Sequence, residues 1–234
     1  MQNTKEVIKE LLNKNKYSFG DLCNLVSVLR SEDGCPWDRE QTNKSIRNCF
    51  IDETYEFIEG LDRDDNKLMC EELGDVLFQV IFHADIKKDD GVFCVDDVID
   101  GICKKMILRH PHVFGSVSVE NSAEVLVNWD NIKNHEKQRK TPYEQLESVS
   151  KALPSLMRAQ KLLSKAAKCG LVDECSFDEA ADMAQGALMK LREGKSAENL
   201  GELLLSIARI SNILGVESEE ILYIENDAFV ERFE

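Results

Sequence analysis

Two short stretches of the sequence place acidic residues beside apolar ones in a way that an ordinary core helix does not. The stretch IDETYEFI contains Glu53 and Glu56, and the stretch CEELGDVL contains Glu72 and Asp75. Each pair is spaced by three residues, so on a helix its two carboxylates lie on one stripe of the surface. If the two stripes face each other, four carboxylates meet.

Four converging carboxylates repel one another and cannot all stay charged without a counterion. Oxygen ligands suit a hard divalent cation, so we predict a Mg²⁺ site, with Mn²⁺ as the alternative ion. Mg²⁺ held by carboxylates usually also binds substrate phosphates, which indicates phosphate chemistry. The competing interpretation is a pair of solvated helix faces, which are common in a chain with 44 acidic residues.

Two helices joined by a short turn are predicted to bring the acids together. The apolar spacing predicts helices over residues 44–61 and 66–88, with DRDD as the turn, so the two helices are antiparallel neighbours. The acids flank the apolar stripes, and Gly74 indicates a close backbone approach. The stripes expected to pack consist of Phe50, Thr54, Phe57, Ile58 and Leu61 in the first helix and Leu73, Val76, Leu77, Val80, Ile81 and Ala84 in the second.

The rest of the chain also carries helix punctuation, without convincing strand alternation, so the predicted fold class is all-α. Ser18 and Asp21 form a capping box that opens a helix, as do Ser176 and Glu179, and Gly215 ends another. Loops are expected at GCPWD, at HPHVFGSVS and along a polar link. The further helices are expected near residues 96–109, 122–139, 155–169, 177–193, 197–214 and 218–232.

The composition is that of a globular protein that does not bind nucleic acid. Its 234 residues suffice for one large domain or two small ones. A formal charge of −15 would repel a phosphate backbone, whereas a free nucleotide is accepted once a divalent cation reverses the local sign. We expect no membrane span and no signal peptide. Eight cysteines without a CxxC pair argue against zinc and favour reduced thiols in a cytoplasmic protein.

A faint internal repeat suggests two related helical units in tandem. The stretch EELGDVLFQVI (71–81) matches ENLGELLLSIA (198–208) at a spacing of 127 residues. The alternative is that two buried helices share a Leu-Gly pair by chance.

Five stretches, in this order, resemble the successive signatures of the MazG family of nucleoside triphosphate pyrophosphohydrolases. They are GCPWDREQT (34–42), DETYE (52–56), EELGDVLFQVIFHA (71–84), RHPHVFG (109–115) and NWDNIKNHEK (128–137). The resemblance implies an all-α, homodimeric enzyme that uses Mg²⁺ to hydrolyse a nucleoside triphosphate to the monophosphate and diphosphate. House-cleaning of the nucleotide pool is a role that fits this activity.

The family's metal motif, EExxE followed by ExxD, implies which residues bind the ion and act in catalysis. The first Glu of the motif is Asp52 in this chain, and its helical angle points it away from the ligand stripe. The implied ligands and catalytic residues are Glu53, Glu56, Glu72 and Asp75.

Weaker similarity, carried by PSLMRAQKLLSKAAKCG and NDAFVERF, is to the family's second unit. Its ExxD position reads Asn199 and Glu202, and its EExxE position falls on either DEAAD (178–182) or GALMK (186–190). The ligand set is incomplete in both registers, so this unit is expected to be degenerate and structural or dimer-forming. The predicted organisation is an N-terminal helical extension (1–17), a four-helix-bundle-like catalytic unit (18–140), a linker (141–154) and the degenerate second unit (155–234).

The resemblance also implies residues that bind the substrate. Positive charge is needed at the leaving diphosphate, and basic residues in family-like motifs are predicted to supply it, although each also suits a solvated helix face. Trp129 is a candidate to stack on the base or pack a dimer seam, Trp37 is expected in the core, and Gln79 is expected to hold a water of the cation. The proton acceptor is either one of the four carboxylates or a hydroxide on the cation. The predicted basic residues are Lys105, Arg109, Lys133 and Lys137.

The predicted function is therefore a Mg²⁺-dependent nucleoside triphosphate pyrophosphohydrolase whose chemistry rests on the N-terminal unit. The alternative, from a different class, is a non-catalytic helical module that binds a nucleotide or a partner protein. A four-helix unit that has a metal site between its helices has little apolar core. This, together with the resemblance, predicts a homodimer.

Overall fold

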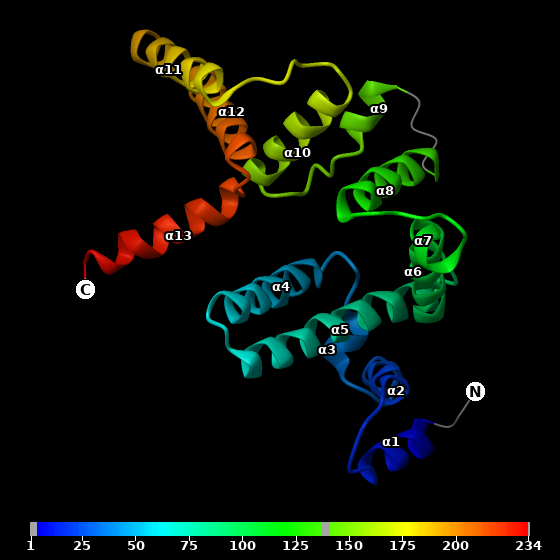
Figure 1. Ribbon diagram of the computed structural model, residues 1–234. Helices are drawn as coiled ribbons and strands as arrows, with labels where there is room; N and C mark the ends of the chain where they lie inside the picture. Colours follow the sequence, from blue (N-terminus) through cyan, green and yellow to red (C-terminus); the bar gives the residue numbers. More distant parts are fainter. Residues whose placement is uncertain (1–3, 137–140, 234) are drawn as a thin grey trace. The chain divides into compact units, whose positions relative to one another are not determined.

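The computed structural model describes residues 4–136 and 141–233, and every regular element in these ranges is a helix. This confirms the predicted all-α class. The chain divides into two compact units, Met1–Glu120 and Asn121–Glu234, each of which is described by itself (Figure 1). None of the helices in the described ranges is long and apolar enough to cross a membrane.

The first unit contains seven helices within its described residues, and two of them form its central hairpin. These are α4 and α5, which lie side by side (Figure 1). The helices of this unit are α1 (Thr4–Leu12), α2 (Phe19–Leu29), α3 (Pro36–Glu40), α4 (Arg47–Asp62), α5 (Asn66–Asp89), α6 (Val95–Arg109) and α7 (Pro111–Phe114).

The turn between α4 and α5 is built by three local features. The Asp65 side chain accepts hydrogen bonds from the backbone N–H groups of Lys67 and Leu68 at 2.9 and 3.1 Å, and so caps the start of α5. Asp64 adopts a left-handed conformation with φ of 52°, which Asp tolerates better than most residues. At the buried Gly60, an added Cβ would lie 3.0 Å from the backbone nitrogen of Met69, so a larger residue would push the two arms apart.

The core of the first unit forms where α2 meets the C-terminal half of α5. At the edge of this core, Arg30 forms ion pairs with two residues of α5. Its Nη1 lies 2.5 Å from Asp85 and its Nη2 lies 2.8 Å from Asp89. The buried cluster consists of Val26, Ile46, Ile81, Phe82 and Ile86.

The predicted apolar stripes are only partly packed. Ile81 and Ala84 are buried as expected, but Leu73 remains 50% exposed and Leu77 39% exposed. Ile58 and Leu61 on α4 are also exposed. The reason is that the core cluster engages only the C-terminal half of α5, so the half that follows the turn keeps apolar side chains at the surface.

Two segments expected to be loops contain short helices instead. GCPWD runs into α3, and HPHVFGSVS begins with α7, and in each case a proline occupies the first helical turn. Proline at this position fixes a helical φ and loses no hydrogen bond, so it starts a helix as readily as it ends one. The expectation that Trp37 packs in the core was wrong, because its side chain is 59% exposed.

The second unit begins at residue 121 and contains a second hairpin, α11–α12, against which α10 packs. The predicted capping box is confirmed, since Ser176 and Glu179 bond each other's backbone N–H groups, and Gly215 ends α12 at φ 69°. Buried Gln160 donates to Val216 O at 2.8 Å and accepts from the Ser218 N–H at 2.7 Å, which ties α10 to the start of α13. Its helices are α8 (Ser122–Glu136), α9 (Pro142–Glu147), α10 (Ser155–Lys168), α11 (Phe177–Glu193), α12 (Ala197–Leu214) and α13 (Ser218–Glu231).

The division between the compact units falls at residue 120, which places α8 with the second unit. The segment 141–154, expected to be a plain polar link, carries the short helix α9. The functional boundaries predicted at 17, 140 and 154 remain predictions.

Candidate functional site

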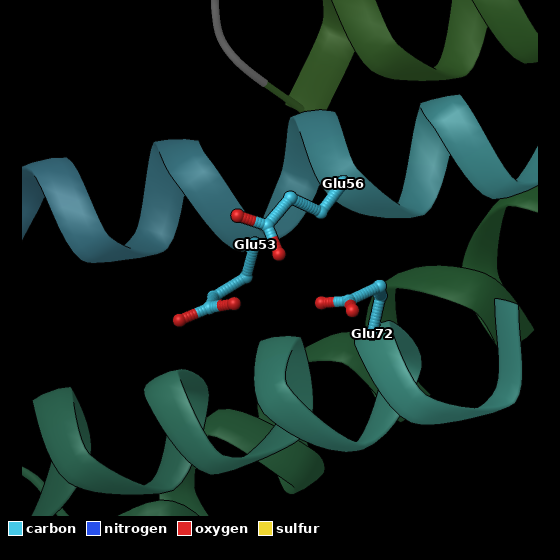
Figure 2. A group of neighbouring side chains, drawn as sticks. All are labelled: Glu53, Glu56 and Glu72. Carbon is cyan, nitrogen blue, oxygen red and sulfur yellow. The ribbon is translucent and has the colours of Figure 1, made fainter. Parts of the chain in front are cut away.

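Three of the predicted ligands meet on the α4–α5 hairpin. One carboxylate oxygen from each of Glu53, Glu56 and Glu72 lies within 4.8 Å of the other two. Figure 2 shows Glu53 and Glu56 reaching from α4 towards Glu72 on α5. Glu72 is buried, Glu53 is half-buried and Glu56 is exposed, so the group, called here the carboxylate cluster, opens to solvent on one side.

The hairpin geometry explains why these residues meet. Glu56 lies six residues before the end of α4 (62 − 56), and Glu72 lies six residues after the start of α5 (72 − 66). In an antiparallel hairpin, residues equally far from the turn face each other. Glu53 lies one turn further from the turn on the same stripe of α4 as Glu56, and therefore completes the group.

Burial and repulsion between acids raise the pKa of two carboxylates of the cluster, Glu72 and Glu53. Desolvation raises the pKa of Glu72 above its ordinary value, and repulsion from Glu56 and Asp75 raises it further. For Glu53, desolvation again comes first, followed by repulsion from Asp75 and Glu56. All the charged neighbours that shift these two groups within the described residues are acids, so nothing there offsets their repulsion.

The cluster fits a hard divalent cation. Glu72 is 5% exposed, yet its Oε2 has no hydrogen-bond partner among the described residues. A buried carboxylate oxygen without a donor is costly, and a bound cation would satisfy it. The donor set contains only carboxylate oxygens, which suits Mg²⁺ or Mn²⁺ rather than a softer metal.

Asp75, the fourth predicted ligand, borders the cluster without being one of the three converging side chains. It is exposed and lies one turn beyond Glu72 on α5. Its charge nevertheless raises the pKa of both Glu53 and Glu72, which places it within electrostatic reach of both. Gln79 continues the same stripe; it is 8% exposed, and its Oε1 has no partner among the described residues.

The predicted basic and aromatic residues belong to helices other than α4 and α5 or lie outside the described residues. Lys105 and Arg109 are on α6, where Lys105 is half-buried and Arg109 is buried. Trp129 and Lys133 are half-buried residues of α8, in the second unit. Lys137 lies outside the described residues. Their roles in substrate binding stay predictions.

One polar contact that supports the hairpin was missed from the sequence. The Asn43 side chain, before α4, lies 2.8 Å from Nδ1 of His83 and donates to the His83 carbonyl at 3.0 Å. The ring of Phe50 meets the His83 ring edge to face, with the centroids 5.8 Å apart. This contact fixes the start of α4 against α5, on the side away from the turn. A single Asn in a polar loop carries no signal that distinguishes it from its neighbours.

Comparison with known proteins gives consistent matches. Residues 41–114, which include the whole carboxylate cluster, match the MazG nucleotide pyrophosphohydrolase domain. The chain is 37% identical over 223 residues to the nucleoside triphosphate pyrophosphohydrolase of Escherichia coli K12, covering 91% of this chain and 84% of that protein.

Two further relatives extend this pattern. A Thermotoga maritima protein called nucleoside triphosphate pyrophosphohydrolase/pyrophosphatase MazG is 36% identical over 92% of this chain and 84% of its own length. The uncharacterized protein YabN of Bacillus subtilis is 39% identical over 93% of this chain, which spans only 46% of that longer protein.

Proposed function

The chain belongs to the MazG family of nucleoside triphosphate pyrophosphohydrolases, and from this premise we propose that the carboxylate cluster of its first unit carries the hydrolysis. The reaction converts a nucleoside triphosphate and water into a nucleoside monophosphate and diphosphate. The observation that carries the proposal is the buried, unpartnered oxygen of Glu72, which faces two further carboxylates.

We assign the cation to this cluster. Glu53, Glu56 and Glu72 would hold Mg²⁺, or Mn²⁺ in its place, and Asp75 would complete the set from the solvent side. When bound, the ion neutralises the triphosphate and makes a water molecule a better nucleophile at neutral pH. Because the cluster opens to solvent on one side, the triphosphate has a route to it.

The chain's own residues position the substrate and take up a proton. The water oxygen attacks the α-phosphorus, the bond from that phosphorus to the oxygen bridging it to the β-phosphorus breaks, and diphosphate leaves. A carboxylate of the cluster accepts the proton of the water. Lys105 and Arg109 on α6, and Lys133 and Lys137 further along, are proposed to bind the phosphates.

The remaining assignments concern the whole chain. The second unit is proposed to be structural or dimer-forming, and the active form is proposed to be a homodimer. The apolar side chains of Leu73 and Leu77, exposed beside the cluster, support pairing with a second copy. We place the enzyme in the cytoplasm, where the eight cysteines, all free thiols here, would stay reduced.

The experiment that tests the function is a measurement of diphosphate release. A panel of ribonucleoside and deoxyribonucleoside triphosphates is incubated with the protein, with Mg²⁺ and with a chelator. We expect release of diphosphate and monophosphate in equal amounts, from at least one nucleotide, only when Mg²⁺ is present. No release from any nucleotide would instead favour the non-catalytic binding module.

A further inference from the structure

The second helical hairpin, α11–α12, has the same turn length as the first. Three residues, 63–65, separate α4 from α5, and three residues, 194–196, separate α11 from α12. The repeat of EELGDVLFQVI in ENLGELLLSIA aligns Glu72 with Asn199 and Asp75 with Glu202. The two hairpins can therefore be compared position by position through this alignment.

The aligned positions lie about one helical turn closer to the turn in each arm of the second hairpin. Sixteen positions separate Glu56 from Glu72 (72 − 56), and nine separate Lys190 from Asn199 (199 − 190). The difference of seven residues is about two helical turns, and a shift of about one turn towards the loop in each arm leaves the same faces opposed. By this count Lys190 takes the place of Glu56, and Ala187, three residues earlier, takes the place of Glu53.

The contacts across the second hairpin agree with this register. Lys190 Nζ on α11 lies 2.8 Å from Glu202 Oε2 on α12. The Asn199 side chain turns back and donates to the carbonyls of Lys190 at 3.2 Å and Gly194 at 2.6 Å, which closes the turn. Ala187 is buried and offers no ligand atom. Each position of the first hairpin's acid set thus has a counterpart here, and only Glu202 is still acidic.

The other possible register places Glu179 far from the turn. Glu179 of DEAAD lies fourteen residues before the end of α11 (193 − 179). Its carboxylate accepts hydrogen bonds from the Ser176 backbone N–H at 2.8 Å and hydroxyl at 2.9 Å, so it is engaged in the cap at the far end of the helix.

We propose that the second hairpin is a copy of the first in which the ammonium group of Lys190 supplies the positive charge that a divalent cation supplies at the carboxylate cluster. This rests on the cation site proposed for the first unit. A lysine on one arm faces the remaining acid on the other, and the position equivalent to Glu72 holds an amide that closes the turn. The second hairpin is therefore neutralised without metal, and it binds none.

The experiment counts bound Mn²⁺ on the full-length chain, by the electron paramagnetic resonance signal of the free ion. The wild-type count tests the first site. In the background variant Glu53→Gln/Glu72→Gln, which disables that site, we expect Mn²⁺ binding to fall to none. Mn²⁺ still bound in this background, and lost on adding Glu202→Gln, would overturn the proposal.

The decisive step adds Lys190→Glu to the same background. A carboxylate at position 190 would face Glu202, so we expect Mn²⁺ binding to reappear, at roughly one ion per chain. Lys195→Glu is the matched control, because it makes the same change of charge in the turn and should bind none. Circular dichroism confirms that each variant is helical. If the folded Lys190→Glu variant binds no more Mn²⁺ than the Lys195→Glu variant, the second hairpin is not a copy of the first and the proposal fails.

Discussion

At the scale of single residues, three converging carboxylates form the proposed site. Glu53, Glu56 and Glu72 are held close enough to repel, and the buried oxygen of Glu72 lacks a donor among the described residues. A protein with no use for this arrangement would gain stability by replacing one of these acids. The loss of stability is explained if a cation and a triphosphate complete the site.

The first prediction separates the two hairpins by activity. Glu72→Ala should lower the rate of diphosphate release by roughly 100-fold or more, since it removes the one buried ligand. Glu202→Ala, at the position of the second hairpin that matches Asp75, should keep activity within about twofold of wild type, because its partner Lys190 lies outside the proposed active site. Steady-state kinetics with Mg²⁺ measure both, and the opposite pattern would assign the chemistry to the second unit.

The second prediction concerns Asp75, whose negative charge repels those of Glu53 and Glu72. Without metal, Asp75→Asn removes repulsion and should melt at the wild-type temperature or above it. A ligand that binds only the native state at a hundredfold excess over Kd adds about 2.7 kcal/mol, or roughly 5–10 °C for a chain of this size. Wild type should gain that much on adding Mg²⁺, and Asp75→Asn much less.

The control for this experiment is Asp62→Asn, at the exposed end of α4, which removes the same charge away from the cluster. It should respond to Mg²⁺ as wild type does. Differential scanning calorimetry at constant ionic strength gives all three melting temperatures. If Asp75→Asn melts lower without metal and keeps the full Mg²⁺ shift, the acids are structural and the metal assignment fails.

At the scale of elements, helix ends were the most predictable features. The Ser18–Asp21 and Ser176–Glu179 boxes lie where the sequence predicted them, because a cap depends only on residues three apart. The facing acids were predictable for a related reason, because two long helices joined by a short turn must lie antiparallel and side by side. The helices α3 and α7 were missed because proline signals a start and a stop equally.

Other parts of the site required information that no local pattern holds. The exposure of Leu73 and Leu77 depends on which half of α5 the core engages, and this is set by contacts with α2. The Asn43–His83 contact joins residues forty positions apart. Long-range packing decides both features, and hydrophobic periodicity carries no information about long-range packing.

The third prediction tests the cap of α2 through its dependence on pH. Asp21 accepts hydrogen bonds from Ser18 and pairs with Lys14, and its hydrogen bonds, that from Lys14 first, lower its pKa from 3.8 to about 2. A carboxylate with a lowered pKa in the folded state stabilises the protein above its unfolded pKa and loses that effect as the pH falls. Asp21→Asn should therefore be less stable than wild type at pH 7, and the difference should shrink between pH 3.8 and about 2.

Urea unfolding followed by circular dichroism, at a series of pH values, measures this difference. Asp33→Asn, in the exposed loop after α2, is the charge-matched control and should show a small difference that does not follow this window. A penalty for Asp21→Asn that stays constant down to pH 2 would show that the cap does not depend on the charge.

At the scale of the whole molecule, the exposed apolar side chains indicate an interface with a partner. Leu73, Leu77 and Ile58 all lie on the hairpin that carries the carboxylate cluster. Apolar side chains gathered on one element are costly in water and commonly mark an interface. A second copy of the chain is the partner that we propose.

The fourth prediction is that light scattering at micromolar concentration gives twice the 26.6 kDa of one chain. Leu73→Glu should shift the mass towards the monomer, because it places a charge where an apolar contact is needed. Val92→Glu, at a residue that is more exposed than Leu73 and lies in the loop after α5, is the control and should leave the mass unchanged. A wild-type mass of one chain would refute the dimer.

The short turn between α4 and α5 also bears on the speed of folding. Only sixteen positions separate Glu56 from Glu72, so the hairpin closes a small loop, and such local contacts form early. The mutual repulsion of the acids then acts against one of the first contacts that the chain makes. Mg²⁺ in the refolding buffer should speed refolding severalfold in stopped-flow fluorescence, and Glu72→Gln should refold faster than wild type without it. If Mg²⁺ only slows unfolding, the acids meet after the rate-limiting step of folding. Their mutual repulsion would then not slow the folding of the hairpin.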